Sequence, residues 1–269
     1  MRRVGHAGTL DPLADGVLPV CFGRATRVVE YLMDARKVYL VSIHLGIETD
    51  TYDADGQTIA EKDASHISLA QIEAALLQFR GEIMQRPPHF SAIKKEGVPL
   101  YKHARAGRIL EVPARPVFIY RLDIRSYEPP CLVLEVECGK GTYVRSLAHD
   151  LGAGLGVGAM VAALTRTRVG PFPIDNAVDL ETLSLEVEER RWQERLLPLD
   201  EVVLDWPAAI LGPENERLLL TGRAPALALR PGYRLQAGER CRAYGPGGDF
   251  LAVLRAGPLA EWLPEKVFA

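Results

Sequence analysis

The feature that most constrains this chain lies near its start, where one acidic residue stands in a run of glycine, proline and small apolar residues. The run covers residues 5–19 and reads GHAGTLDPLADGVLP, with Asp11 directly before Pro12. Proline fixes its own φ and pushes the preceding residue towards an extended conformation, so we expect Asp11 to be presented on a shaped loop. The spacing is also that of an ordinary Asp-Pro turn. The apolar residues 17–22 predict a buried strand under the loop.

Composition is that of a globular protein. The chain has 269 residues, 48% of them hydrophobic, and a net charge of −3, which suits one large domain and a smaller one. No apolar run approaches the roughly 18 residues of a membrane span, and no apolar stretch follows Met1-Arg2-Arg3, so we expect a cytoplasmic protein without a secretory signal. The four cysteines include no C-x-x-C pair. We therefore expect buried free thiols and no metal site.

A basic segment stands out against the negative net charge. Residues 86–115 hold seven lysines and arginines against two glutamates, interleaved with Phe90 and Tyr101. Cations contact phosphates and aromatic rings stack on unpaired bases, so the segment fits an RNA-binding element. A charged run of this kind is as often a solvated surface. The cations are Arg86, Lys94, Lys95, Lys102, Arg105, Arg108 and Arg115.

Apolar periodicity predicts alternating helices and strands after the Asp11 loop. We expect a strand that opens at Lys37 and places Tyr39 at its mouth. After a tight turn at residues 139–142 we expect a helix with Tyr143 and Arg145 near its start. Further helices are expected within residues 25–33, 69–79 and 100–106, and further strands at 117–125 and 131–138.

Three stretches resemble ligand-binding motifs, but each lacks a feature that its motif requires. The acidic turn at residues 49–56 lacks the acids that a calcium loop needs at its first and twelfth positions, where Thr51 and Lys62 stand. At most it would help to shape a substrate cleft. The turn at 139–142 lacks the spacing of a phosphate-binding loop. The glycines of residues 152–158 follow a helix, whereas a dinucleotide fingerprint follows a strand.

The Asp11 loop resembles the signature of the TruB-type tRNA pseudouridine synthases, G-H-x-G-x-L-D-P-x-A-x-G-V-L, over residues 5–18. The resemblance extends over nearly the whole chain in the family's order. It is carried further by KVY at 37–39, RPP at 86–88, FSAIK at 90–94, GVPLY at 97–101, GKGTYVRS at 139–146 and TRTRVGPF at 165–172.

This resemblance implies a fold. We expect an α+β pseudouridine synthase core over residues 1–203, with a mixed, mainly antiparallel sheet flanked by helices. Residues 204–269 are expected to form a small β-barrel, a PUA-like RNA-binding domain. The family carries a strand and a helix before the G-H-x-G motif, beginning with an L-x-x-x-K-P element. Only four residues precede Gly5, so we expect those two elements to be missing here.

The resemblance also implies an activity, the isomerisation of uridine 55 to pseudouridine in the T loop of tRNA, without cofactor or metal. Asp11 matches the catalytic nucleophile. Arg145 matches the arginine that pairs with this aspartate. Tyr39 matches the tyrosine that stacks on the target uracil, and its hydroxyl is a candidate for proton removal from C5.

Other positions are expected to bind the substrate. His6 matches the histidine that enters the T loop, and Tyr143 and Leu164 match positions that line the uracil pocket. By resemblance the basic segment grips the T arm of tRNA, and we expect three of its lysines to make that contact. These are Lys94, Lys95 and Lys102. We expect tRNA as the partner, no protein partner, and a monomer.

Two alternatives stay open. A non-catalytic module for tRNA binding or folding would use the basic segment and the C-terminal domain equally well. A hydrolase of nucleoside glycosidic bonds would need a second carboxylate and a path for water. Asp15 is the candidate near Asp11 in the sequence.

Overall fold

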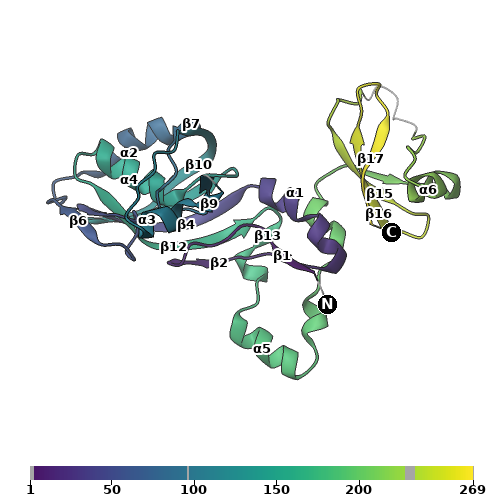
Figure 1. Ribbon diagram of the computed structural model, residues 1–269, viewed down its shortest axis with the longest axis horizontal. Helices are drawn as coiled ribbons and strands as arrows, with labels where there is room; N and C mark the ends of the chain where they lie inside the picture. Colours follow the sequence, from purple (N-terminus) through teal and green to yellow (C-terminus); the bar gives the residue numbers. More distant parts are fainter. Residues whose placement is uncertain (1–2, 96, 228–233, 269) are drawn as a thin grey trace. The chain divides into compact units, whose positions relative to one another are not determined.

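The computed structural model describes residues 3–95, 97–227 and 234–268. The chain forms two compact units, and Figure 1 labels most of their helices and strands. The larger unit contains Ala7–Pro19 and Met33–Ala177, and the smaller unit contains Met1–His6, Val20–Leu32 and Val178–Ala269. The smaller unit thus takes in segments from both ends of the chain. The expected boundary between residues 203 and 204 stays a prediction.

A seven-stranded sheet forms the centre of the larger unit (Figure 1). Its strands run in the order β13-β12-β4-β11-β10-β7, and β2 pairs with β12 off this path. The β2–β12 pairing is parallel, whereas the other strand pairings described in this sheet are antiparallel. The mixed, mainly antiparallel sheet is therefore confirmed. The strands are β2 (Ala14–Gly16), β4 (Lys37–Leu45), β7 (Gly81–Gln85), β10 (Arg115–Glu128), β11 (Cys131–Cys138), β12 (Ala159–Val169) and β13 (Phe172–Pro173).

Helices α2 (Leu69–Leu76) and α4 (Val144–Gly154) share a hydrophobic core with this sheet. Along β4 the side chains of Val41, Ile43 and Leu45 are buried, and Leu40 is exposed, because successive side chains of a strand point to opposite faces of the sheet. Helix α2 begins with a capping box, because the Ser68 side chain accepts from the backbone N–H of Gln71 while the Gln71 side chain accepts from that of Ser68.

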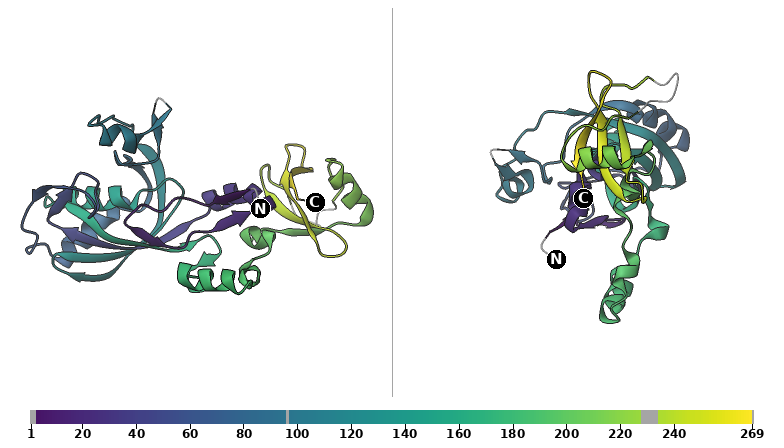
Figure 2. Two further views of the ribbon diagram at one scale, coloured as in Figure 1. Left: turned by 60° about the horizontal axis from the view of Figure 1, so that its bottom comes forward. Right: turned by 90° about the vertical axis from the view of Figure 1, so that its right-hand side faces the viewer.

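The basic segment rises from the larger unit as a separate projection, which Figure 2 shows standing off the sheet. It contains the short strands β8 (Lys94–Lys95) and β9 (Val98–Pro99) and the helix α3 (Leu100–Arg105). Gly107 follows with a φ of 73°, a left-handed conformation that glycine adopts readily at a helix end. The predicted helix at 100–106 is confirmed. A further hairpin of this unit pairs β5 (Ile47–Thr49) with β6 (Thr58–Glu61).

The smaller unit contains a four-stranded sheet in the order β14-β15-β16-β17. Within the described residues, the first and last of these strands do not pair with each other, so the predicted barrel is not confirmed. No helix of the described residues is long and apolar enough to cross a membrane. The unit contains α5 (Leu180–Glu188), β14 (Ala208–Ile210), α6 (Pro213–Leu220), β15 (Arg240–Tyr244), β16 (Phe250–Ala256) and β17 (Trp262–Val267).

Three local predictions were wrong. The strand predicted at 17–22 is limited to β3 (Val20–Phe22), which pairs with β1 (Val4–His6) and exposes its first and last side chains. Pro19 has no N–H for a strand ladder, which explains the late start. The helix predicted within 25–33 is divided into a 3-10 turn at Gly23–Arg27 and α1 (Val29–Asp34). Cys131 is exposed, whereas the other cysteines are buried.

Helix α4 approaches β12 so closely that one of its glycines is required. A Cβ added to Gly152 would overlap the backbone of Ala159. At Gly154 the same atom would meet only the Gln78 side chain, at 3.5 Å. The glycine-rich stretch is thus a close-packed helix end.

We expect Gly152→Ala to lower the free energy of unfolding by about 1–3 kcal/mol, because the added methyl group must push α4 away from β12. Gly154→Ala is the matched control and should change that free energy by no more than about 1 kcal/mol. Urea unfolding followed by circular dichroism measures both. Equal stability of the two variants would contradict the close contact.

Candidate active site

The Arg145 side chain, which is 4% exposed, connects three loops of the larger unit. Its Nε donates to Asp11 Oδ2 at 2.8 Å. Its Nη1 lies 3.1 Å from Asp53 Oδ2 and donates to the Thr51 carbonyl at 3.0 Å. Its Nη2 donates to the Phe90 carbonyl at 3.0 Å. A guanidinium stays charged when buried, so this side chain can hold two carboxylates at once.

The position of Arg145 follows from the anchoring of the first turn of α4. The side-chain amide of Gln85, at the end of β7, accepts from the backbone N–H of Tyr143 at 2.8 Å and donates to its carbonyl at 3.0 Å. The Ser146 hydroxyl donates to the Arg86 carbonyl at 2.9 Å. The start of the helix is therefore tied to the sheet and to the base of the basic segment.

The Asp11 carboxylate is the accessible member of this cluster. Its side chain is 33% exposed, against 4% for Asp53. Among the described residues, Asp11 Oδ2 accepts the hydrogen bond from Arg145, and Oδ1 accepts none. The backbone N–H of Ala14 donates to the Asp11 carbonyl at 2.9 Å and closes the turn. The arrangement presents one oxygen of a carboxylate whose other oxygen is held.

The sequence did not identify Asp53 as a member of this site. Its carboxylate also accepts from the Thr51 hydroxyl and from the backbone N–H of Asp55 at 3.2 Å. The Thr49 hydroxyl donates to its carbonyl at 2.7 Å. An aspartate shortly after two threonines, Thr49 and Thr51, was the available signal. Its cationic partner lies in α4, and only the tertiary structure brings the two together.

Tyr39 and Leu164 lie on the neighbouring strands β4 and β12, and Leu164 is 6% exposed. Burial raises the pKa of Tyr39 to about 12, and the Asp11 charge acts in the same direction. A hydrogen bond and positive charge from Arg166 oppose this rise. The Tyr39 hydroxyl therefore keeps its proton near pH 7, and its oxygen accepts the hydrogen bond from the Arg166 guanidinium, which can only donate.

The remaining predicted residues lie in different parts of the structure. Tyr143 directly precedes α4, two residues before Arg145. Lys94 and Lys102 are exposed on the projecting segment, while the Lys95 ammonium donates to a carbonyl of the same segment at 2.8 Å. His6 lies on β1 in the smaller unit. The binding roles of these residues stay predictions.

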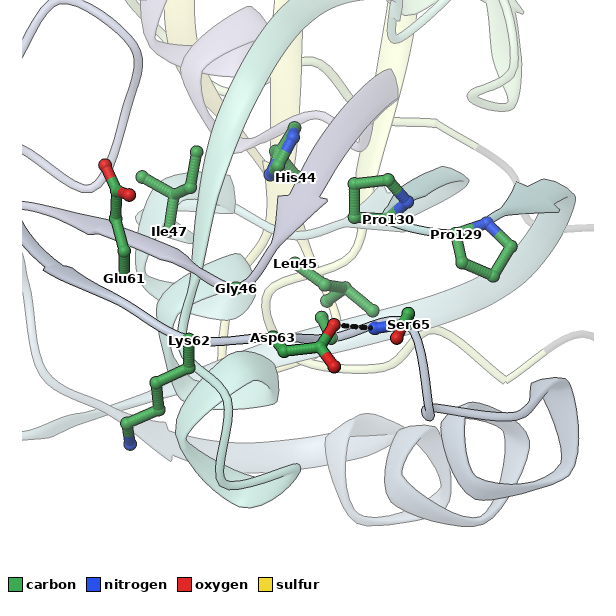
Figure 3. A pocket seen from close by; sticks show the side chains of 11 residues that line it. His44, Leu45, Gly46, Ile47, Glu61, Lys62, Asp63, Ser65, Pro129 and Pro130 are labelled. Carbon is green, nitrogen blue, oxygen red and sulfur yellow. Dashed lines mark hydrogen bonds between the residues drawn. The ribbon is translucent and has the colours of Figure 1, made fainter.

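A separate pocket lies between the end of β4 and the turn at Pro129 and Pro130 (Figure 3). It shares no residue with the Arg145 cluster. Its Asp63 carboxylate accepts from the backbone N–H of Ser65 at 2.9 Å, so that charge already has a local partner. The chemistry of the Asp11 cluster, rather than the shape of this pocket, identifies the candidate active site.

Family models match most of the chain. Residues 1–144 match the N-terminal domain of the TruB family pseudouridylate synthases, and residues 145–206 match the C-terminal domain of tRNA pseudouridylate synthase B. A tRNA pseudouridine synthase B of Pseudomonas aeruginosa is 49% identical over 230 residues, which are 83% of this chain and 75% of that protein. One from Dehalococcoides mccartyi is 39% identical over 267 residues, covering 99% and 87%.

A solved structure is similar over the whole chain. It is an H/ACA ribonucleoprotein bound to a substrate RNA that contains 2′-deoxyuridine. The matched chain is 25% identical to this one with a TM-score of 0.73, over 100% of this chain and 77% of that one.

The two carboxylates should differ in their effect on stability. Asp53→Asn removes a buried charge from a buried guanidinium and should lower the free energy of unfolding by about 3 kcal/mol or more. Asp11→Asn leaves Arg145 paired with Asp53 and should cost less than about 1 kcal/mol, because the lost partner is partly solvated. Urea denaturation at pH 7 measures both. A larger loss for Asp11→Asn would contradict these roles.

Proposed function

Because the chain belongs to the TruB family of pseudouridylate synthases, we propose that it converts uridine to pseudouridine in tRNA with Asp11 as nucleophile. It is thus an isomerase of the pseudouridine synthase class. The observation that carries the residue assignment is the pairing of Asp11 with Arg145. One carboxylate oxygen is held at 2.8 Å by a buried guanidinium, and the other stays open in a partly exposed loop.

The proposed reaction rearranges one bond without a change in redox state. The C1′–N1 glycosidic bond breaks, the uracil turns, a C1′–C5 bond forms, and the proton on C5 is replaced by one on N1. Asp11 Oδ1 is the group free to react with the nucleoside, whereas Oδ2 remains on Arg145. A positioned carboxylate with an immobile cation needs little reorganisation during the reaction.

In this proposal Tyr39 and Leu164 hold the uracil after its glycosidic bond has broken. The flat Tyr39 ring provides a stacking surface, and Leu164 provides an apolar wall. A tyrosine whose pKa is about 12 holds its proton at pH 7, so a resting phenolate is disfavoured. We therefore assign the Tyr39 ring to stacking as its main role.

We propose uridine 55 in the T loop as the target. The relatives named tRNA pseudouridine synthase B support tRNA as substrate. The exposed cations Lys94 and Lys102 and the neighbouring Lys95 suit contacts with the phosphates of the T arm. His6 would enter the loop, and Tyr143 would line the uracil pocket. We further propose a PUA-like RNA-binding domain at residues 204–269, a monomeric protein and a cytoplasmic location.

Two features weigh against the alternatives. A module that only binds RNA gains nothing from a partly exposed carboxylate, since this charge repels phosphates. A hydrolase of glycosidic bonds needs a second carboxylate as acid and base, and a path for water. Asp15 is exposed and belongs to β2, whereas the second carboxylate of the cluster, Asp53, is buried on the same guanidinium as Asp11.

Asp11→Asn tests the proposed nucleophile, because it preserves the side-chain volume and removes the nucleophilic oxygen. The rate of pseudouridine formation should fall at least about 1,000-fold, equal to about 4 kcal/mol in the barrier. The Kd for tRNA should change little, because affinity comes from phosphate and stacking contacts. The measurements are nuclease digestion with mass spectrometry for the product and filter binding for the Kd.

Asp15→Asn is the matched control, because it makes the same substitution in the same loop at an exposed position outside the Arg145 cluster. It should retain activity close to the wild type. Normal pseudouridine formation by Asp11→Asn would remove Asp11 from the mechanism.

A further inference from the structure

A second buried arginine lies beside the site and has no place in the proposed chemistry. The Arg166 side chain is 1% exposed and is the largest of the fully buried side chains in the described residues. Its Nε donates to the Val17 carbonyl at 2.8 Å, and its Nη2 donates to the Gly8 carbonyl at 3.0 Å. These two carbonyls stand on either side of Asp11 in the sequence. One guanidinium thus holds both ends of the Asp11 loop.

The backbone of Arg166 also contacts the Asp11 loop. On β12 it stands opposite Gly16 of β2 on one side and opposite Tyr39 of β4 on the other. The backbone N–H of Val17 donates to the Arg166 carbonyl at 2.8 Å. A Cβ on Gly16, whose φ is 98°, would overlap the Arg166 backbone. Arg166 therefore fixes the position of the Asp11 loop relative to Tyr39.

The charge of Arg166 is costly in this position. Within the described part of the chain, no carboxylate lies within ion-pair distance of its guanidinium, and its described hydrogen bonds go to neutral groups, the Val17 and Gly8 carbonyls and the Tyr39 hydroxyl. Burying a cation without an anionic partner costs several kcal/mol, and an apolar side chain would fill the space at lower cost. The same charge acts on the Tyr39 hydroxyl. We therefore attribute the presence of a buried arginine here to the needs of the candidate active site, not to the stability of the core.

We propose that Arg166 is a positioning residue, which holds both ends of the Asp11 loop on β12 so that the Asp11 carboxylate and the Tyr39 ring face one substrate in fixed register. This inference rests on the proposed function, since it assigns Arg166 a part in the same isomerisation. Arg166 does not touch the reacting atoms. It acts through Asp11 and Tyr39.

Arg166→Lys tests the proposal, because it retains the charge but replaces the planar fork by a single ammonium, which cannot reproduce both loop contacts with the same geometry. In single-turnover assays with excess enzyme, the rate of pseudouridine formation should fall about 10- to 100-fold. The Kd for tRNA should stay near the wild-type value. Arg168→Lys is the matched control, since Arg168 lies on the same strand, pairs with Glu137 at 3.2 Å and is partly solvated. It should retain the wild-type rate.

A double-mutant cycle with Tyr39→Phe separates positioning from a purely structural role. If Arg166 sets the register between the loop and the tyrosine, the combined loss should differ from the product of the single losses. Multiplicative losses, or a rate loss for Arg166→Lys no larger than its loss of folded protein, would overturn the proposal. An inactive wild-type chain would overturn the proposed function and this inference together. An active wild type with an unaffected Arg166→Lys would overturn this inference alone.

Gly16→Ala tests the same register from the loop if Arg166→Lys fails to fold. The added methyl group should displace the loop from β12 and lower the single-turnover rate by a similar factor at an unchanged Kd. Gly156→Ala is its control, because Gly156 also has a positive φ, 79°, and an added Cβ there meets no atom within 4 Å. Equal rates for these two glycine variants would overturn the proposal.

Discussion

The buried guanidinium of Arg145 is the interaction on which the rest of the site depends. It receives the Asp11 loop, the Thr51–Asp53 turn and the start of the basic segment on three of its nitrogens. Burying this charge is favourable only because its hydrogen bonds are satisfied in good geometry. The first turn of α4 must therefore be held in place, and the Gln85 amide and the close contact of Gly152 with β12 do this.

The two carboxylates that pair with Arg145 differ in exposure and therefore in role. Asp53 is buried and hydrogen-bonded by its own turn, so it offsets the positive charge and orients Arg145. Asp11 is partly exposed and keeps one oxygen open, which suits it to meet a substrate. Arg166 holds both ends of the Asp11 loop through the Gly8 and Val17 carbonyls. Two arginines thus fix the loop, and only its central carboxylate is left free to react.

Local patterns predicted much of this framework, including β11 over Cys131–Cys138, the opening of β4 at Lys37 and the first turn of α4. These elements follow from alternation and helical periodicity, which depend on neighbours in the sequence. The role of Asp53 depends on a cation far along the chain, so no local pattern contains it. The strand predicted at 17–22 failed because an apolar run does not show which backbone groups are paired.

The most direct test of the central claim is tritium release from tRNA labelled at C5 of uridine, with the purified 269-residue chain. Forming the C1′–C5 bond expels the C5 hydrogen, which hydrolysis or binding alone leaves in place. We expect release of about one tritium per pseudouridine formed, with the RNA chain intact. Bound tRNA without release, or a loss of uracil that leaves an abasic site, would contradict it.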